Sequence, residues 1–412
     1  MTFIRFGGIK LKSKTFVLFL LAAVIGLSGV RAQSEAGAIF LLISPGARAG
    51  GMGEAQVAVA DDAYASYWNP AGLGFLKGSE LALMHVNWLP NLADDLYYEF
   101  LAYRNHIPYL GTVGGHIIFL NLGEQNRTGQ FAEDLGTFTT YMMALSLSYS
   151  SLLSTKSSLG LNAKISYQHL AGIGAGSESS KGTSTDFGFD IGYLYRGLWT
   201  PRLDLGLTLT NIGPKVAFID AAQADPQPTN FTLGIQYRIV DSPFNRLSIA
   251  YDVDKMMVAS YPDMDWDADG GVGDYDEDGN FSPGGDFNKD KQRETAHTDP
   301  IYLALFTSWV DDWFLGGDID WGTADYPSDR KIGGWQWNND DNGNGEPDPS
   351  EMEETDDVEY GEPGYGIYNH AGQKEVGTGD DRSISNEIDK LVHNVGFEYW
   401  YAENFALRMG YY

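Results

Sequence analysis

Two acidic stretches of the sequence have the residue types and spacing of a calcium-binding loop, D-x-[DN]-x-[DN]-G-x5-E. The first is DDNGNGEPDPSE, whose oxygen ligands would come from Asp340, Asn342, Asn344 and Glu351. The second is DWDADGGVGDYD, which ends in Asp in place of Glu and whose ligands would come from Asp265, Asp267, Asp269 and Asp276. Ca²⁺ binds hard oxygen ligands of this kind. The spacing therefore predicts calcium as the one possible cofactor, bound in at least one of these loops.

A plain solvated acidic loop is the alternative reading of both stretches. No helical pattern flanks them, and Pro347 and Pro349 are unusual inside a calcium loop. The acid is also concentrated beyond the two motifs. Residues 261–300 and 335–389 hold 12 and 16 acidic residues against 3 and 2 basic ones, which is -23 of the net charge of -29. The acid therefore belongs to two inserts, and so acidic a chain is not expected to bind nucleic acid.

The N-terminus has the pattern of a secretory signal peptide over residues 1–32. Four basic residues and no acid lie within the first 14 positions, and residues 15–30 are almost wholly apolar. The small-residue sequence VRA then predicts cleavage after Ala32. A membrane anchor is the alternative, but the apolar run is short for a spanning helix. The chain has no cysteine, so the exported protein would be stable without disulfides.

The part of the chain that follows alternates apolar and polar residues with a period of two, which is typical of β-strands. In residues 203–210, for example, leucines alternate with Asp, Gly and Thr. Thirteen such segments are expected: 80–89, 97–106, 111–121, 138–150, 158–169, 186–196, 202–211, 230–239, 246–254, 300–310, 313–322, 391–401 and 404–412. No later stretch is apolar for the 18 residues that a spanning helix needs.

Long and short connections alternate between these segments, as they do in outer-membrane barrels. The two acidic inserts, 255–299 and 323–390, both fall on the long-loop side, which faces outward. The sequence therefore predicts an all-β transmembrane antiparallel β-barrel over residues 80–412. A soluble β-sandwich is the alternative, but it has no reason to keep this order of loop lengths. Bacterial barrels normally have an even number of strands, so a fourteenth strand is expected to be absent from this chain.

Residues 33–79 precede the first strand and are expected to fill the barrel as a plug. This segment contains the phrase SYWNPAGLG, and its motif residues are Trp68, Asn69, Pro70, Ala71 and Gly72. We expect the aromatic residues to fill space, the proline to fix a turn, and the glycines to allow a sharp return to the wall. A simple surface turn is the alternative.

The plug segment and several strands resemble known families of outer-membrane proteins. The phrase NPAGL before the first strand looks like the plug segment of FadL-type channels for hydrophobic compounds. Three longer phrases resemble the PorV/PorQ family of outer-membrane proteins: SPGARAGGMGEAQVAVADDAYASYWNPAGL, LTNIGPKVAFID and PQPTNFTLGIQYR. The similarity covers most of residues 38–254 and returns in VGFEYWYAENFALRMGYY, but it does not cover the acidic inserts.

The resemblance implies a FadL-like barrel of about fourteen strands in the outer membrane of a Gram-negative bacterium. It further implies contact with membrane lipid and lipopolysaccharide, and a role in type IX secretion, in which cargo proteins are accepted by their C-terminal signal domain and passed on. The partners would then be secreted cargo and other type IX components. A FadL-like channel for hydrophobic small molecules is the alternative function.

The sequence favours a protein without enzymatic activity. Its seven histidines are scattered, and neither an HExxH nor a GxSxG motif is present. A hydrolase with a catalytic triad assembled across barrel strands is the alternative that motifs alone leave open.

The calcium prediction can be tested by isothermal titration of the purified protein. We expect Ca²⁺ to bind the acidic loops weakly, with a dissociation constant of about 10⁻⁴–10⁻³ M, as in other extracellular calcium modules. The double variant Glu351→Gln/Asp340→Asn should lose uptake, since both changes remove a ligand carboxylate. Equal heat from the wild type and the variant would show that this loop is only a solvated acidic segment.

Overall fold

The computed structural model describes residues 3–6, 9–12, 36–91, 93, 95–128, 134–171, 182–218, 224–261, 273–275, 281–283, 297–311, 334–337, 352–355, 388 and 390–412. All the predicted calcium ligands lie outside these ranges, as do residues 13–32 of the predicted signal peptide. Near the N-terminus, the described residues form a short hairpin of β1 (Phe3–Phe6) and β2 (Ile9–Lys12).

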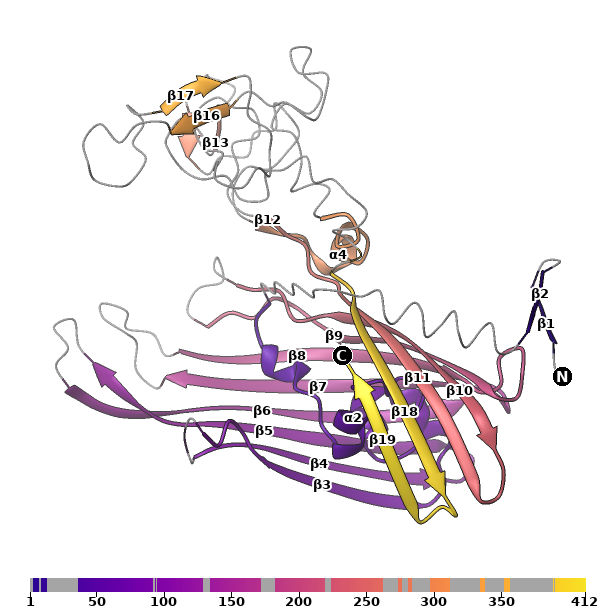
Figure 1. Ribbon diagram of the computed structural model, residues 1–412. Helices are drawn as coiled ribbons and strands as arrows, with labels where there is room; N and C mark the ends of the chain where they lie inside the picture. Colours follow the sequence, from indigo (N-terminus) through magenta and orange to yellow (C-terminus); the bar gives the residue numbers. More distant parts are fainter. Residues whose placement is uncertain are drawn as a thin grey trace.

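The main body is one antiparallel sheet that curves into a barrel wall (Figure 1). Its eleven described strands are β3 (Ser79–Asn87), β4 (Leu96–Ile107), β5 (Gly111–Thr128), β6 (Asp134–Leu152), β7 (Ser157–Ala171), β8 (Gly182–Tyr195), β9 (Leu203–Ile212), β10 (Asn230–Asp241), β11 (Asn245–Met256), β18 (Val392–Tyr401) and β19 (Phe405–Tyr411). Each strand pairs with its neighbours in chain order, from β3 at one edge to β19 at the other. The predicted all-β antiparallel barrel class is confirmed, and within the described residues the sheet is open between β3 and β19.

Shorter elements lie before the wall and between β11 and β18. The helical turns that precede the wall are η1 (Ile39–Leu42), α2 (Ala47–Gly51), α3 (Ala65–Trp68) and η2 (Pro70–Phe75). The connection from β11 to β18 contains α4 (Ile301–Thr307) and three short strand pairs: β12 (Ser260–Tyr261) with β15 (His297–Thr298), β13 (Gly273–Tyr275) with β14 (Phe281–Pro283), and β16 (Gly334–Trp337) with β17 (Met352–Thr355).

The strand predicted at 300–310 is wrong, because residues 301–307 of this segment form the helix α4. The sheet does not need that strand, since β11 pairs directly with β18 through Asn245↔Tyr401 to Asp254↔Val392. The other strand expected in this region, 313–322, falls outside the described residues. The described wall therefore has eleven strands where the sequence analysis expected thirteen.

The expected alternation of loop lengths is present in part of this wall. The connections after β4, β6, β10 and β18 are tight, as in residues 153–156 and 242–244, and those after β7, β9 and β11 are long. It fails between β5 and β9, because the connection after β5, residues 129–133, is shorter than the one after β8, residues 196–202. In an up-and-down sheet successive connections lie at opposite ends, so the long connections after β7, β9 and β11 share one end of the wall (Figure 1). We call the two ends the long-loop end and the short-turn end.

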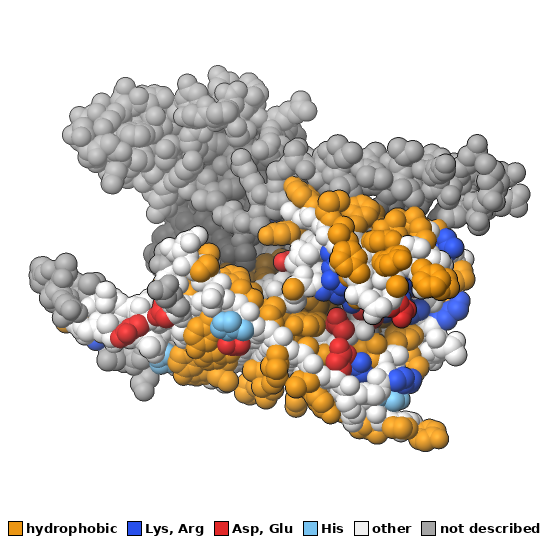
Figure 2. Space-filling model, turned by 60° about the horizontal axis from the view of Figure 1, so that its bottom comes forward, with side chains coloured by type: hydrophobic (Ala, Val, Ile, Leu, Met, Phe, Trp, Pro, Cys, Tyr) orange, Lys and Arg blue, Asp and Glu red, His pale blue; other side chains and the backbone are white. Residues whose placement is uncertain are grey.

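The distribution of side chains is inverted relative to a soluble protein. On β6, the apolar residues Leu145 and Leu147 are exposed on the outer face, whereas Ser146 and Ser148 are buried on the inner face. Similar alternation runs along β7 and β8. Figure 2 shows hydrophobic side chains over much of the described surface. An apolar outer face around a polar interior is the arrangement of a barrel in lipid.

A row of aromatic side chains marks one border of this apolar band. Near the long-loop end, the rings of Tyr97, Phe119, Tyr141 and Tyr167 follow one another across four strands at centroid distances of 6.0–6.1 Å. On β6 the band runs from Tyr141 to Tyr149. These eight residue steps span about 20 Å for a strand tilted by roughly 40°. This is close to the apolar band of about 25 Å of outer-membrane barrels. None of the described helices is both long enough and apolar enough to traverse a bilayer.

The chain has no cysteine, so single cysteines can test its orientation in the membrane. We expect a membrane-impermeant maleimide to label Ser177→Cys, in the long connection after β7, on intact cells. It should label Thr155→Cys, in the turn between β6 and β7, only after the outer membrane is permeabilised. Equal labelling of both sites on intact cells would contradict this orientation.

Candidate functional site: the plug and its seat

The segment from residue 36 to residue 78 runs along the inside of the wall, and we call it the plug. It contains η1, α2, α3 and η2, and at least eighteen of its side chains are buried. Ala38, Phe40 and Leu41 pack against the inner faces of β4 and β5 in an apolar cluster with Tyr98, Phe100 and Ile118. The plug therefore has a core in common with the wall.

The predicted motif residues lie at the end of α3 and in η2. Asn69, Pro70, Ala71 and Gly72 are buried, whereas Trp68 is only partly buried. The Trp68 indole N–H donates to the Pro45 carbonyl at 3.2 Å, so this side chain closes the plug on itself. The motif thus lies inside the protein and is not a surface turn.

Asn69 explains why this motif has an asparagine before its proline. Its side-chain Nδ2 donates to the Val57 carbonyl at 2.8 Å and to the Tyr193 carbonyl of β8 at 3.2 Å. Its Oδ1 accepts the backbone N–H of Ala71 at 3.1 Å and so caps η2. One amide thereby joins two turns of the plug to the wall. Pro70 follows at the first position of η2, where a backbone N–H is not needed.

Glycines of the wall let the plug backbone approach the strands directly. They form three cross-strand pairs, Gly160↔Gly192, Gly206↔Gly234 and Gly396↔Gly410, on β7 to β10 and on β18 and β19. A Cβ on Gly160 would lie within 3.0 Å of backbone atoms of Pro70 and Ala71. A Cβ on any of the other five would also meet a plug atom at 3.0 Å or less. We call these six residues the glycine seat.

Side chains of the wall also satisfy backbone groups of the plug. The Asp252 carboxylate on β11 accepts the N–H groups of Gln56 and Val57 at 2.7 and 2.8 Å. The Arg196 guanidinium donates to the carbonyls of Ala58 and Val59 at 3.0 and 2.9 Å. Ser150 adds a hydrogen bond to the Ala71 carbonyl. The irregular backbone of the plug is therefore hydrogen-bonded along its path around the wall.

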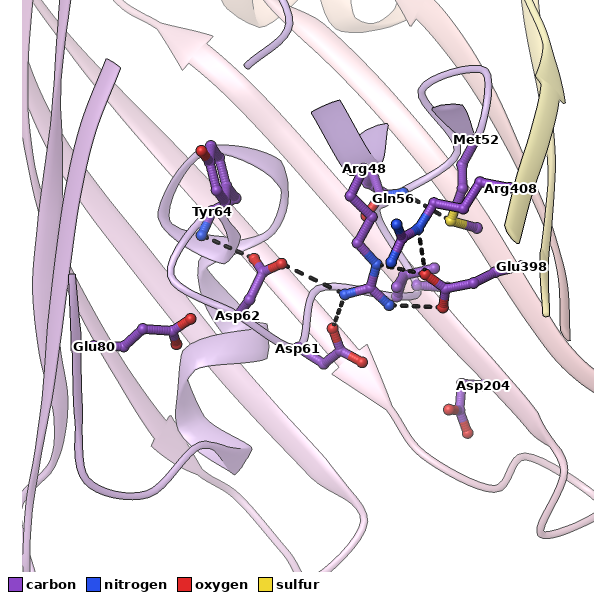
Figure 3. Close-up of polar contacts among 12 residues, drawn as sticks. Arg48, Met52, Gln56, Asp61, Asp62, Tyr64, Glu80, Asp204, Glu398 and Arg408 are labelled. Carbon is purple, nitrogen blue, oxygen red and sulfur yellow. Dashed lines mark hydrogen bonds and ion pairs between the residues drawn. The ribbon is translucent and has the colours of Figure 1, made fainter. Parts of the chain in front are cut away.

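An ion-pair cluster joins the plug to the last two described strands (Figure 3). Arg48 of α2 donates through two nitrogens to the Glu398 carboxylate of β18, at 2.8 and 2.9 Å. Arg48 also pairs with Asp61 and Asp62 of the plug, and Arg408 of β19 donates to Glu398 at 2.8 Å. Glu398 is buried, and a buried carboxylate needs such partners. Burial raises the pKa of the Asp62 carboxyl, and the charge of Arg48 offsets part of this rise.

Next to the glycine seat, the inner faces of β7 and β8 carry a second polar cluster. Lys164 pairs with Asp190 at 3.1 Å, and both are buried. Asn162 donates to Asp190 at 2.7 Å and to the Ser66 carbonyl of the plug at 2.8 Å. Among the described residues, no group of three or more His, Cys, Asp or Glu side chains is placed to hold a metal ion.

The sequence analysis singled out the motif but missed its partners. Nothing in the local sequence marks Arg48, Asp252 or Glu398 as partners of the plug, because their contacts join positions up to 350 residues apart. The glycine seat could be recognised in the sequence, because its glycines occupy inward-facing positions in strands whose residues alternate between apolar and polar.

Comparison with known proteins gives one family and several distant structures. The family model described as "Type IX secretion system protein PorV" matches residues 31–263. No curated protein matches the chain.

Among solved structures, the toluene transporter TbuX of Ralstonia pickettii is similar at 16% identity over 52% of this chain and 73% of that chain, with a TM-score of 0.37. The toluene transporter TodX of Pseudomonas putida is similar at 13% identity over 52% and 70% of the two chains, with a TM-score of 0.35.

The glycine seat can be tested with Gly160→Ala. The added methyl group would overlap the backbone of Pro70 and Ala71, and overpacking of this kind costs about 1–3 kcal/mol. We expect the plug to become more sensitive to protease while the wall remains resistant. Gly50→Ala in α2 is the matched control, because its Cβ would have no heavy atom within 4 Å. Equal protease patterns for the two variants would contradict a direct seat for the plug.

Proposed function

Because the chain belongs to the family of the type IX secretion system protein PorV, we propose that it is a non-enzymatic outer-membrane barrel that handles or shuttles secreted cargo proteins. The observation that carries the proposal is the family match, which covers more than half of the chain. The partners would be cargo proteins with a C-terminal signal domain and other components of type IX secretion.

The way the plug is held supports a scaffold in which the barrel interior is filled. Buried or partly buried hydrogen bonds to Asp252 and from Arg196 and Asn69 fix the plug backbone to itself and to the wall. Moving the plug out of the barrel would leave those polar groups without partners, which costs free energy. A protein built in this way offers its long-loop end, where the acidic inserts begin, as the surface for other proteins.

The alternative function, a channel for hydrophobic small molecules, requires an apolar path through the interior. The inner faces of β7 and β8 carry Asn162, Lys164 and Asp190 in one hydrogen-bonded cluster. A hydrocarbon passing these side chains would displace their polar contacts without replacing them. The apolar cluster against β4 and β5 is already filled by plug residues such as Phe40 and Leu41. These observations favour the secretion role.

Deletion of the gene in its native host distinguishes the two functions. We expect cargo with type IX C-terminal signal domains to disappear from the cell surface and the medium and to accumulate in the periplasm. Wild-type protein supplied in trans should restore secretion, and tagged protein purified from outer membranes should carry cargo with it. Unchanged secretion together with reduced uptake of a hydrophobic compound would overturn the proposal in favour of the channel.

A further inference from the structure

The helix α4, which replaces a predicted strand, exposes an unusual apolar surface. The helix ends at Thr307 and hydrogen-bonded turns continue it to Val310, and the segment from residue 301 to residue 310 contains no charged residue. Five large apolar residues are exposed at spacings that fall on one side of a helix. They are Tyr302 (66% exposed), Leu303 (44%), Phe306 (75%), Trp309 (40%) and Val310 (41%).

The opposite side of α4 packs against the protein. Ala304 and Ser308 are buried there, and the Ser308 hydroxyl contacts the Met257 sulfur at 3.3 Å. Met257 directly follows β11 and donates its N–H to the Thr229 carbonyl just before β10. The helix is therefore fixed at the long-loop end of β10 and β11, where Figure 1 places it.

The exposed side of α4 is continuous with the outer face of the barrel. The ring of Trp309 meets that of Phe231 edge-on at a centroid distance of 6.2 Å. Phe231 lies on the outer face of β10 together with Leu233 and Ile235, because these three residues alternate with the buried Thr232 and Gly234. The apolar surface of α4 thus extends the lipid-facing surface of the wall.

The charged side chains that flank the helix in the sequence have polar partners. The Asp299 carboxylate accepts the Thr307 hydroxyl at 2.6 Å, and Asp311 pairs with Lys390 at 2.8 Å. An apolar side rich in Tyr, Phe and Trp suits the border between lipid and water, where aromatic residues gather. A helix with such a side lies in the plane of that border.

We propose that α4 is an interfacial helix that inserts its Tyr302–Phe306–Trp309 side into the outer leaflet of the outer membrane and anchors the β11–β18 connection there. The occupant of this surface is lipid, and the inference is independent of whether the protein handles cargo.

Single labelled cysteines test the proposal in vesicles of phosphatidylethanolamine and phosphatidylglycerol that contain a lipid with a nitroxide on its acyl chain. Phe306→Cys and, separately, Tyr302→Cys would carry an environment-sensitive fluorophore. Leu147→Cys on the outer face of β6 is the lipid-facing control, and Thr155→Cys in the β6–β7 turn is the aqueous control. Protease resistance equal to that of the wild type shows that each variant is folded.

We expect the labels at positions 302 and 306 to be quenched by the lipid nitroxide nearly as strongly as the label at position 147. Both should also be shielded from iodide in the aqueous phase. Quenching by iodide and not by the nitroxide would show that α4 faces water, which would overturn the proposal. Shielding from both quenchers would also overturn it, because the surface would then be covered by protein, such as a second copy of this chain.

Discussion

The structure depends on one requirement: an irregular peptide segment inside a barrel must find partners for backbone N–H and C=O groups that no regular ladder satisfies. The plug meets this requirement through side chains of the wall and one of its own. A carboxylate from β11, a guanidinium that follows β8 and the amide of Asn69 each bind two or three backbone groups. The glycine seat brings the plug close enough to the wall for these contacts to form.

The same requirement organises the charges of the interior. Asp204 accepts from both Arg196 and Arg238, at 2.9 and 2.7 Å, so the guanidinium that binds the plug is itself held in place. Arg48 and Glu398 are arranged similarly, with Arg408 as the third member. Removing one partner of a buried pair leaves an uncompensated charge, which destabilises a protein far more than the loss of a surface pair. The interior therefore contains paired charges that hold a plug which is part of the fold.

The sequence predicted the wall well, because strands that face lipid on one side and a polar interior on the other alternate strictly. It failed at residues 300–310, where nearly every residue is apolar. A continuous apolar run has no periodicity that separates a strand from a helix. Only the exposed positions 302, 303, 306 and 310 reveal the helical spacing.

The site was predictable only in part, for a different physical reason. Asn69 and Pro70 form a local turn, and local turns leave a signature in adjacent residues. The pairing of Gln56 with Asp252, or of Arg48 with Glu398, is decided by how the wall curves back on itself. A contact between residues so far apart has no counterpart in the local pattern of a single sequence.

The direct pairing of β11 with β18 also bears on how this protein can change over evolutionary time. Two hydrogen-bonded neighbours in the wall are separated by the whole stretch from residue 257 to residue 391. The entropy of closing such a loop grows only with the logarithm of its length, so doubling it costs about 0.6 kcal/mol. Insertions and deletions in this stretch therefore change the stability of the barrel very little. Natural selection can alter this connection extensively while the wall and plug stay as they are.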